Sequence, residues 1–193
     1  KKLFNSISNK TIITSVLEAE LVKLFSNAWR YINFAASNQF FMICQNFNID
    51  FKRVRSFMMD GYERNSTLPN AGFAAGPCLL KDTMQLSHFV KKRFPLGIES
   101  LNINEGLPLH LVKTLNKNYN LKNKKIGILG LTFKSDVDDI RDSLSFKLLK
   151  ILKKQSLKVF VSDEFYNHPE GISKENLIKK SEIVIVAVPH TKY

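Results

Sequence analysis

The chain has 193 residues, of which 44% are hydrophobic and 11% aromatic, values that exclude a disordered protein. Its 29 lysines and arginines against 17 aspartates and glutamates give a net charge of +12, but the bases lie scattered in short groups, which indicates a solvated surface rather than a nucleic-acid interface. No apolar run is long enough to cross a bilayer, and two cysteines without metal-type spacing exclude a disulfide scaffold and favour a reducing cytoplasm.

The first 60 residues contain neither glycine nor proline, so nothing interrupts a long helix there. Ser15 and Glu18 have the spacing of a capping box, which predicts that a helix begins at this point. Apolar residues then recur at helical spacing to about Phe47. Because this helix is apolar almost all round, we expect it to be buried on several sides, within a domain or at a subunit interface. A second, short helix is predicted at 51–59.

The next segment, 61–77, contains closely spaced glycines and prolines and predicts a structured loop. Helical spacing resumes at 81–90 and again around 102–115. The polar stretch 116–124 then indicates a linker.

Beyond this linker the pattern changes to short apolar runs that alternate with helical segments. Strands are predicted at 126–133, 158–161 and 183–188, and helices at 143–154 and 176–180. This alternation indicates right-handed βαβ units and a parallel sheet. The sequence therefore predicts an all-helical domain with a long buried helix, residues 1–119, followed by a partial Rossmann-like α/β domain, residues 120–193. The second domain is expected to be incomplete, because no helix follows its last strand.

Lys23, Asn27 and Asn38 interrupt the apolar surface of the first long helix. At ~100° per residue, Lys23 and Asn27 lie ~40° apart and Asn27 and Asn38 ~20° apart, so the three form one polar stripe. Such a stripe faces solvent, or forms hydrogen bonds between helices, or holds an ammonium and an amide toward an anion. The spacing alone leaves these alternatives open.

The two cysteines have different surroundings. Cys44 lies among aromatic and aliphatic residues, which favours a buried structural thiol. Cys78 instead follows Ala-Ala-Gly-Pro and directly precedes a predicted helix start, where the helix dipole and a cation such as Lys81 favour the ionised thiol. Asp82, one turn on, is placed to position a water. Taken by itself, Cys78 fits a reactive and a structural thiol equally well.

The first predicted strand carries Gly127-Ile-Leu-Gly130, which is not the G-x-G-x-x-G dinucleotide fingerprint. A nucleotide is still expected at the strand ends, its usual position in open α/β sheets. Phe133, Lys134 and Arg141 are well placed there for phosphates, although ion pairing of Lys134 with neighbouring aspartates is an equally good account. The four histidines show neither a nucleophile partner nor metal-like spacing, so they receive no role and no metal site is predicted.

Three stretches together resemble the nucleotide-sugar dehydrogenases of the UDP-glucose/GDP-mannose dehydrogenase family. They are L-E-A-E-L-V-K-L-F-S-N (17–27), A-G-F-A-A-G-P-C-L-L-K-D (71–82) and I-L-G-L-T-F-K-S-D-V-D-D-I-R-D-S (128–143). Three motifs in family order are much more specific than any one of them. The resemblance covers nearly the whole chain, and it implies the family's central helical dimerisation domain and most of its C-terminal nucleotide-sugar domain.

The resemblance also implies a reaction: oxidation of the C6 alcohol of a UDP-sugar to a carboxylate, with two hydride transfers to NAD. Cys78 matches the nucleophile that captures the intermediate aldehyde as a thiohemiacetal, which becomes a thioester and is then hydrolysed. Lys23 and Asn27 match the helix pair that binds substrate and stabilises developing negative charge on oxygen. Asp82 matches the aspartate associated with the hydrolytic water.

Further positions follow from the same resemblance. Substrate contacts are expected from Arg64, Phe73, Ala75, Gly76, Phe133 and Lys134, with Arg64 reaching the substrate of a neighbouring subunit. Lys81 and Arg141 are expected on the NAD side of the cleft. The expected assembly is a homodimer formed through the long helix.

The chain departs from the family pattern in several places, among them Asn38-Gln39, where Asn-Glu is common. Ala75-Gly76-Pro77-Cys78 replaces the usual G-G-x-C, a change expected to affect sugar preference rather than catalysis. The family's N-terminal NAD-binding domain has no counterpart among these residues, so the chain alone is expected not to turn over. The alternative is a non-catalytic, dimerising nucleotide-binding module that has lost its NAD domain. The motifs do not distinguish UDP-glucose, UDP-N-acetyl sugars and GDP-mannose.

Overall fold

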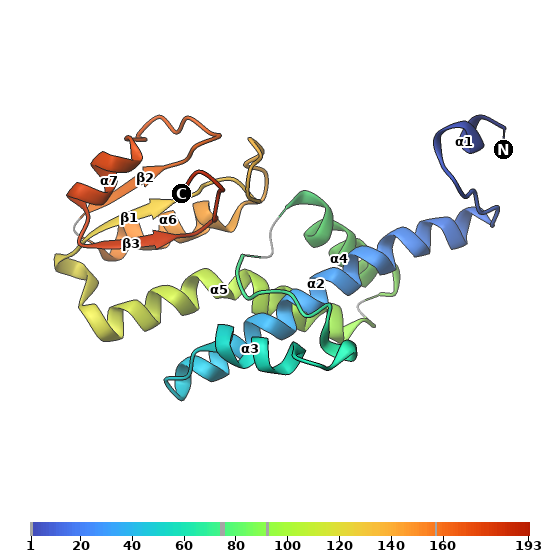
Figure 1. Ribbon diagram of the computed structural model, residues 1–193, viewed down its shortest axis with the longest axis horizontal. Coiled ribbons are helices and arrows are strands. Elements are labelled where there is room, and N and C mark those ends of the chain that lie inside the picture. The colour runs from blue at the N-terminus through green and yellow to red at the C-terminus, as the bar shows by residue number, and fades with distance from the viewer. Residues whose placement is uncertain (1, 74–75, 92, 157) are drawn as a thin grey trace.

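The computed structural model describes residues 2–73, 76–91, 93–156 and 158–193. Its helices are α1 (Lys2–Ile7), α2 (Val16–Asn46), α3 (Phe51–Met59), α4 (Pro77–Phe89), α5 (Pro95–Tyr119), α6 (Leu144–Gln155) and α7 (Lys174–Lys180). Its strands are β1 (Lys125–Leu129), β2 (Lys158–Ser162) and β3 (Ile183–Val186), and two 3-10 turns are η1 (Glu63–Asn65) and η2 (Leu121–Asn123). Figure 1 shows the helices α2 to α5 beside a small sheet, with α1 apart at the far end of α2. None of the described helices has the length and apolar character needed to span a membrane.

Helix α2 begins where the sequence predicts. The hydroxyl of Ser15 accepts a hydrogen bond from the backbone N–H of Glu18, and the Glu18 carboxylate accepts one from the backbone N–H of Ser15 at 2.9 Å. This capping box satisfies N–H groups that the first turn leaves without a partner. The apolar residues that face α4 and α5 are buried, among them Leu24, Ala28, Tyr31 and Ala35. Within this single chain the other side of α2 is exposed, so the helix is buried on one side only.

Helices α4 and α5 begin earlier than their apolar spacing predicts. Pro77 is the first residue of α4, and Pro95 is the first residue of α5. The backbone N–H groups of the first helical turn have no partner within the helix. Proline suits this position because its missing N–H therefore costs no hydrogen bond. At its other end α5 continues through most of the predicted linker to Tyr119, and Asn120 ends it in a left-handed conformation with φ 45°.

The sheet is parallel throughout, with the order β2-β1-β3, which confirms the predicted architecture. Ile126 and Ile128 of β1 share a buried cluster with Leu148 of α6. Gly127, between them, faces the opposite helix: a Cβ on it would lie 2.3 Å from Leu177 on α7. Helices α6 and α7 therefore cover opposite faces of the sheet.

The order of the strands creates a crevice. From β1 the chain moves to β2 on one side and then to β3 on the other, so the direction of winding reverses beside β1. In open α/β sheets ligands bind outside the carboxyl ends of the strands at such a reversal. Figure 1 shows the carboxyl ends of β1 and β3 pointing toward the loop that precedes α4.

Helix α5 connects the helical part to the sheet. Val112 near its end is fully buried in the same cluster as Ile126 and Leu148. At the outer edge of this contact Lys147 of α6 pairs with Glu105 of α5 at 3.2 Å. The end of α5 is thus part of the core of the sheet, and the division of the chain at residues 119 and 120 stays a prediction.

Candidate functional site

Cys78 opens onto a pocket of about 660 Å³ between the helical part and the sheet. The helical part lines this pocket, which we call the cysteine pocket, with Arg30, Phe34, Asn70–Phe73 and Gly76–Leu79. The sheet lines it with Phe133–Ser135, Asp139, Arg141 and Val186–Pro189. Phe133–Ser135 come after β1, and Val186–Pro189 begin at the last residue of β3. The pocket therefore lies at the crevice that the strand order creates.

The start of α4 presents Cys78 to the pocket. Cys78 is the second residue of this helix and is exposed. The preceding Gly76 has φ +112°, a conformation that residues with a Cβ rarely adopt. A Cβ on Gly76 would also lie 2.8 Å from Cδ2 of Phe133. Glycine therefore allows the Phe133 ring, from the loop after β1, to close against the turn that carries the thiol.

Hydrogen bonds from α2 anchor the loop that leads to Cys78. Ser37 donates to the carbonyl of Pro69, and the backbone N–H of Gly72 donates to Oδ1 of Asn38, both at 2.8 Å. The amide nitrogen of Asn38 in turn donates to Oδ1 of Asn104 on α5 at 2.8 Å. Asn38 is fully buried. Of the alternatives for the polar stripe, hydrogen bonding between helices is therefore correct for Asn38.

The other two residues of the stripe meet the predicted aspartate. Nζ of Lys23 lies 2.6 Å from Oδ2 of Asp82, and the amide of Asn27 donates to the same oxygen. Partial burial alone would raise the pKa of Asp82, but the hydrogen bonds from Lys23 and Asn27 and the charge of Lys23 outweigh it and hold this pKa below its usual range. The structure thus brings Lys23, Asn27 and Asp82 together.

This cluster lies beside the cysteine pocket rather than in it. Lys23 and Asp82 line a different pocket, of about 750 Å³, toward the start of α2. Asp82 is one helical turn beyond Cys78 on α4, and Arg30, which lines the cysteine pocket, is two turns beyond Lys23 on α2. Helices α2 and α4 run antiparallel, so the cluster of Lys23, Asn27 and Asp82 is the neighbour of the cysteine pocket along this pair of helices.

Three cations and one carboxylate line the cysteine pocket: Arg30, Lys134, Arg141 and Asp139. Arg141 pairs with Asp139 at 2.7 Å, and this pairing raises the pKa of Arg141 and lowers that of Asp139. Of the aspartates near Lys134 in the sequence, Asp139 is therefore engaged by Arg141. The surplus of positive charge suits an anionic ligand.

Arg30 and Phe34 were missed as site residues, although the sequence held a signal for them. Each lies seven residues after a member of the stripe, Arg30 after Lys23 and Phe34 after Asn27. Seven residues are about two turns, so these pairs share one face of the helix.

Other predicted positions lie elsewhere. Lys81 on α4 and Arg64 in η1 are exposed and are not among the described residues that line the cysteine pocket. Ala75 lies outside the described residues. Cys44, near the end of α2, is half-buried rather than buried.

The turn after β1, where a dinucleotide fold places the pyrophosphate, is tightly packed. Gly130 in this turn is buried, and a Cβ on it would lie 2.5 Å from the carbonyl oxygen of Val188. The two residues predicted for NAD are also separated, since Arg141 lines the cysteine pocket and Lys81 does not.

Comparisons with protein families match two consecutive parts of the chain. Residues 17–105 match the model of the UDP-glucose/GDP-mannose dehydrogenase family, central domain, and residues 127–193 match that of its UDP binding domain. The UDP-N-acetyl-D-mannosamine dehydrogenase of Pyrococcus horikoshii is 26% identical over 200 residues, which cover 100% of this chain and 47% of the relative. The UDP-glucose 6-dehydrogenase of Rickettsia bellii is 28% identical over 86% of this chain and 40% of its own.

Solved structures of nucleotide-sugar dehydrogenases also resemble this chain. The UDP-D-ManNAc dehydrogenase of Pyrococcus horikoshii superposes with a TM-score of 0.88 at 26% identity, over 99% of this chain and 47% of that one. The UDP-N-acetyl-mannosamine dehydrogenase of Staphylococcus aureus does so with a TM-score of 0.81 at 27% identity, over 93% and 44%. The chain therefore spans about half the length of the relatives that it matches.

Proposed function

The chain belongs to the UDP-glucose/GDP-mannose dehydrogenase family, and on this premise we propose that it is the substrate-binding, cysteine-bearing part of an NAD-dependent nucleotide-sugar 6-dehydrogenase that acts on a UDP-sugar. One observation supports this most: the exposed thiol of Cys78 shares a pocket with Lys134 and Arg141 at the carboxyl ends of the strands. A nucleotide diphosphate held by these cations would direct its sugar toward the thiol. The two free cysteines also support a cytoplasmic location.

In the proposed reaction Cys78 carries the covalent steps. Its sulfur adds to the C6 carbonyl carbon of the aldehyde, and the carbonyl oxygen takes a proton, which gives a thiohemiacetal. After oxidation to the thioester, water adds to the same carbon, the C–S bond breaks, and the sugar carboxylate and the thiol are released. NAD, the family's hydride acceptor, would supply the oxidising power when bound, by taking up one hydride as the C6 alcohol becomes the aldehyde and one as the thiohemiacetal becomes the thioester.

Lys23, Asn27 and Asp82 would serve the oxygen and water of these steps. Lys23 and Asn27 present N–H donors, which stabilise negative charge that develops on the C6 oxygen. The lowered pKa of Asp82 keeps its carboxylate ionised at neutral pH, as an acceptor for the proton of a water needs. Because Asp82 lies one turn from Cys78 on α4, these three groups would act on the C6 oxygen and the water beside the Cys78 sulfur.

We expect the chain to bind UDP and to lose most of this affinity when Lys134 is replaced by alanine. A lysine that meets a phosphate forms a charge-assisted hydrogen bond, so its loss should weaken binding about tenfold or more. Isothermal titration calorimetry with UDP measures both affinities. The matched control is Lys150→Ala, which removes an exposed lysine of α6 in the same domain.

Two results would contradict the proposed nucleotide site. One is an absence of heat from UDP at millimolar concentration with the unmodified chain. The other is an equal loss of affinity in Lys134→Ala and Lys150→Ala, because a general loss of positive charge would then explain the effect.

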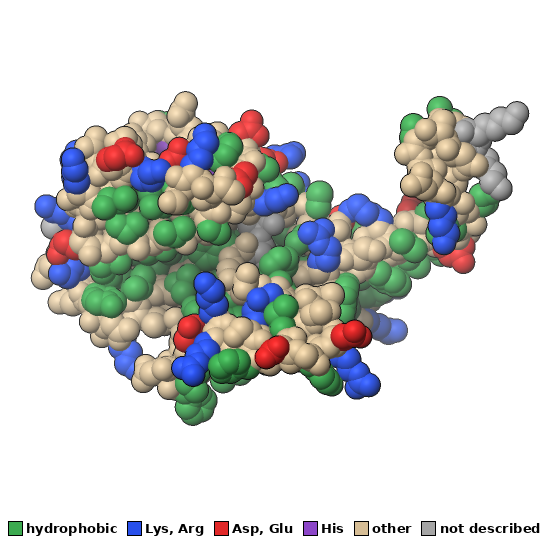
Figure 2. All heavy atoms as spheres, in the orientation of Figure 1, with side chains coloured by type: hydrophobic (Ala, Val, Ile, Leu, Met, Phe, Trp, Pro, Cys, Tyr) green, Lys and Arg blue, Asp and Glu red, His purple; other side chains and the backbone are tan. Residues whose placement is uncertain are grey.

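We also propose that the chain dimerises through α2. Its exposed side carries Val22, Phe25 and Trp29, which are 64%, 55% and 63% exposed. Phe25 and Trp29 line an apolar pocket with Leu86 of α4 and with the segment that follows this helix. Figure 2 shows apolar side chains along the part of α2 that extends toward α1. An apolar surface of this extent is seldom left in contact with water. Light scattering should therefore give the mass of a dimer at micromolar concentration.

A charge placed in this surface should separate the subunits. Trp29→Glu is expected to give a monomer, whereas Ile178→Glu, at an apolar residue of α7 that is 52% exposed, should leave the dimer intact. A monomeric unmodified chain, or dimers in both variants, would count against an interface on α2.

A further inference from the structure

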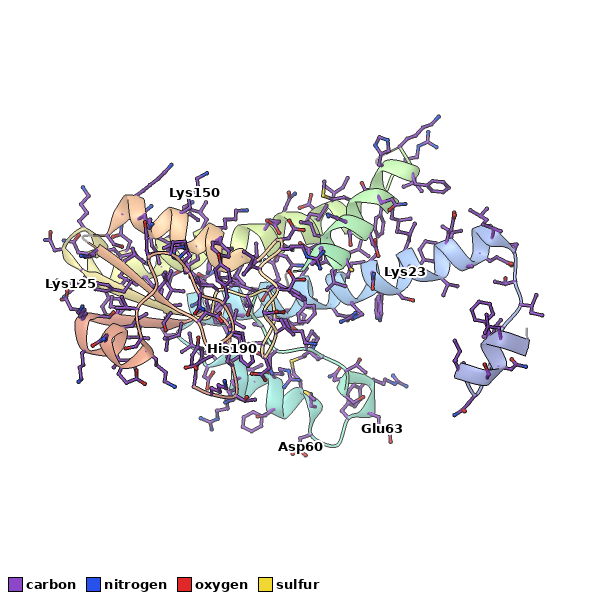
Figure 3. The ribbon with its side chains drawn as sticks, turned by 90° about the horizontal axis from the view of Figure 1, so that it is seen from above. Lys23, Asp60, Glu63, Lys125, Lys150 and His190 are labelled. Atoms are coloured by element: carbon purple, nitrogen blue, oxygen red, sulfur yellow. The ribbon has the colours of Figure 1, made fainter. Side chains whose placement is uncertain are left out.

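His190 and Asp163 form a buried pair at the end of the sheet. Both side chains are fully inaccessible, and Nε2 of His190 lies 3.1 Å from Oδ2 of Asp163. His190 follows β3 and Asp163 follows β2, and the loop after β1 forms hydrogen bonds with both. Figure 3 shows His190 among these loops, well away from Lys23 on α2.

The hydrogen bonds define the form of the histidine. The backbone N–H of Asp136 donates to Nδ1 of His190 at 2.9 Å, so Nδ1 is an acceptor. The ring proton must then be on Nε2, which donates it to Asp163. A neutral His190 in this tautomer joins a backbone N–H on one side to a carboxylate on the other.

The same pair holds both ends of the segment that carries Lys134. Before Lys134, the backbone N–H of Thr132 donates to Oδ2 of Asp163 at 3.2 Å, and the Thr132 hydroxyl donates to the carbonyl of Lys134 at 2.9 Å. After Lys134, the backbone N–H of Asp136 is held by His190. Lys134 therefore lies in a short segment whose two ends form hydrogen bonds with the buried pair of His190 and Asp163.

The backbone at Asp136 needs such a constraint. Its φ of 59° is left-handed, a conformation that is unfavourable for residues with a side chain, although aspartate adopts it more readily than most. Strained backbone of this kind persists where surrounding groups fix it. Here His190 fixes the N–H, and the backbone N–H and hydroxyl of Thr191 donate to the Asp136 carboxylate at 2.9 and 3.1 Å.

We propose that His190 is a positioning residue for the nucleotide site. It holds the 132–136 segment in its strained form, and thereby keeps Lys134 and Phe133 turned into the cysteine pocket. This role rests on the proposed function in so far as Lys134 binds the nucleotide. His190 itself touches no substrate.

The first test needs no ligand. Amide hydrogen exchange, read by mass spectrometry on the peptide that contains residues 131–136, should be about tenfold or more faster in His190→Ala than in the unmodified chain. The control is His168→Ala. Nδ1 of His168 also accepts a backbone N–H, that of Glu170 at 3.1 Å, but away from this loop. Unchanged exchange at 131–136 in His190→Ala would overturn the proposal.

The second test asks whether His190 acts through Lys134. By titration with UDP, His190→Ala should weaken binding about tenfold in the unmodified background and less than about twofold when Lys134 is already alanine. His190→Asn places an acceptor near the position of Nδ1 and should recover most of the loss. If His190→Ala does not fold, His190→Leu, which fills more of the same space but accepts no hydrogen bond, replaces it with the same expected loss. Additive losses, or no recovery in His190→Asn, would mean a general structural role and overturn the proposal.

The two tests separate this inference from the proposed function. If the unmodified chain binds no UDP, the proposed function fails, and faster exchange at 131–136 would still show that His190 holds the segment. If UDP binds through Lys134 but neither His190 variant changes exchange or affinity, the inference alone fails.

Discussion

Replacing Cys78 by serine is expected to abolish net oxidation to the acid, by on the order of a thousandfold or more, in a dehydrogenase that joins this chain to an NAD-binding domain. Cys78 is exposed at the second position of α4, where its sulfur is accessible to a ligand in the cysteine pocket. A serine hydroxyl stays protonated there, captures an aldehyde poorly and forms an ester that hydrolyses slowly. Measurement of the sugar acid by chromatography, together with the rate of NADH formation, checks this.

Cys44 provides the matched control for this replacement. Its thiol is half-buried near the end of α2, away from the residues that line the cysteine pocket. Cys44→Ser should leave the rate of oxidation largely unchanged and lower stability by no more than about 1 kcal/mol, the low end of the cost of an unpaired hydroxyl. Thermal unfolding measures this loss.

The expected difference in reactivity between Cys78 and Cys44 can also be measured in this chain without a cofactor. Iodoacetamide should label Cys78 faster than Cys44, because Cys78 is both more exposed and at a helix start. Peptide mass mapping after short reaction times gives the two rates. Equal labelling, or faster labelling of Cys44, would show that α4 does not present a reactive thiol, and the proposed mechanism would lose its central residue.

Local signals in the sequence predicted most of the helices, strands and the parallel sheet. The capping box of Ser15 and Glu18 marks the start of α2 because it acts within one turn of chain. The serine at 143 is a simple N-cap of α6, with its hydroxyl accepting from the N–H of Ser145. The apolar spacing placed the starts of α4 and α5 too late, since the prolines that begin them are not part of an apolar pattern.

The site was predictable only in so far as its residues share a motif or a helix face. The resemblance pointed to Cys78, Lys134 and Arg141, which the structure gathers into one pocket. Contacts between distant segments gave no such signal. The Phe133 ring against Gly76 and the pairing of His190 with Asp163 depend on how the sheet packs, which no local pattern encodes. His190 consequently received no role from the sequence.

Replacing Asp82 by asparagine is the second change with a large expected effect. In the complete dehydrogenase, Asp82→Asn should lower kcat by about 10²–10⁴-fold, the usual contribution of a general base, and leave KM for the UDP-sugar nearly unchanged. Asparagine cannot accept the proton of the water that releases the thioester, whereas its size is almost that of aspartate. The slow step should then be hydrolysis, so rapid mixing should show a burst of NADH followed by slow turnover.

The matched control is Glu105→Gln, which removes a carboxylate that also pairs with a lysine, Lys147 at 3.2 Å, but outside the cysteine pocket and its neighbouring cluster. This variant should show neither a burst nor a loss of kcat. A proportional fall of kcat in both variants, or a normal kcat in Asp82→Asn, would remove Asp82 from the proposed hydrolysis.

The acid dependence of stability gives an independent check on the Asp82 cluster. The pKa of Asp82 in the folded chain is lowered, chiefly through Lys23 and Asn27 against the opposing effect of burial. The carboxylate therefore stabilises the fold fully above its ordinary pKa of 3.8, and this contribution is lost as the pH falls through the lowered value. Because Lys23 is 61% exposed, the contribution should stay below about 1 kcal/mol. The difference in Tm between the unmodified chain and Asp82→Asn should accordingly be constant from pH 8 to about 5 and shrink below about 4. A difference that grows in acid would mean that Asp82 is not held as the ionised partner of Lys23.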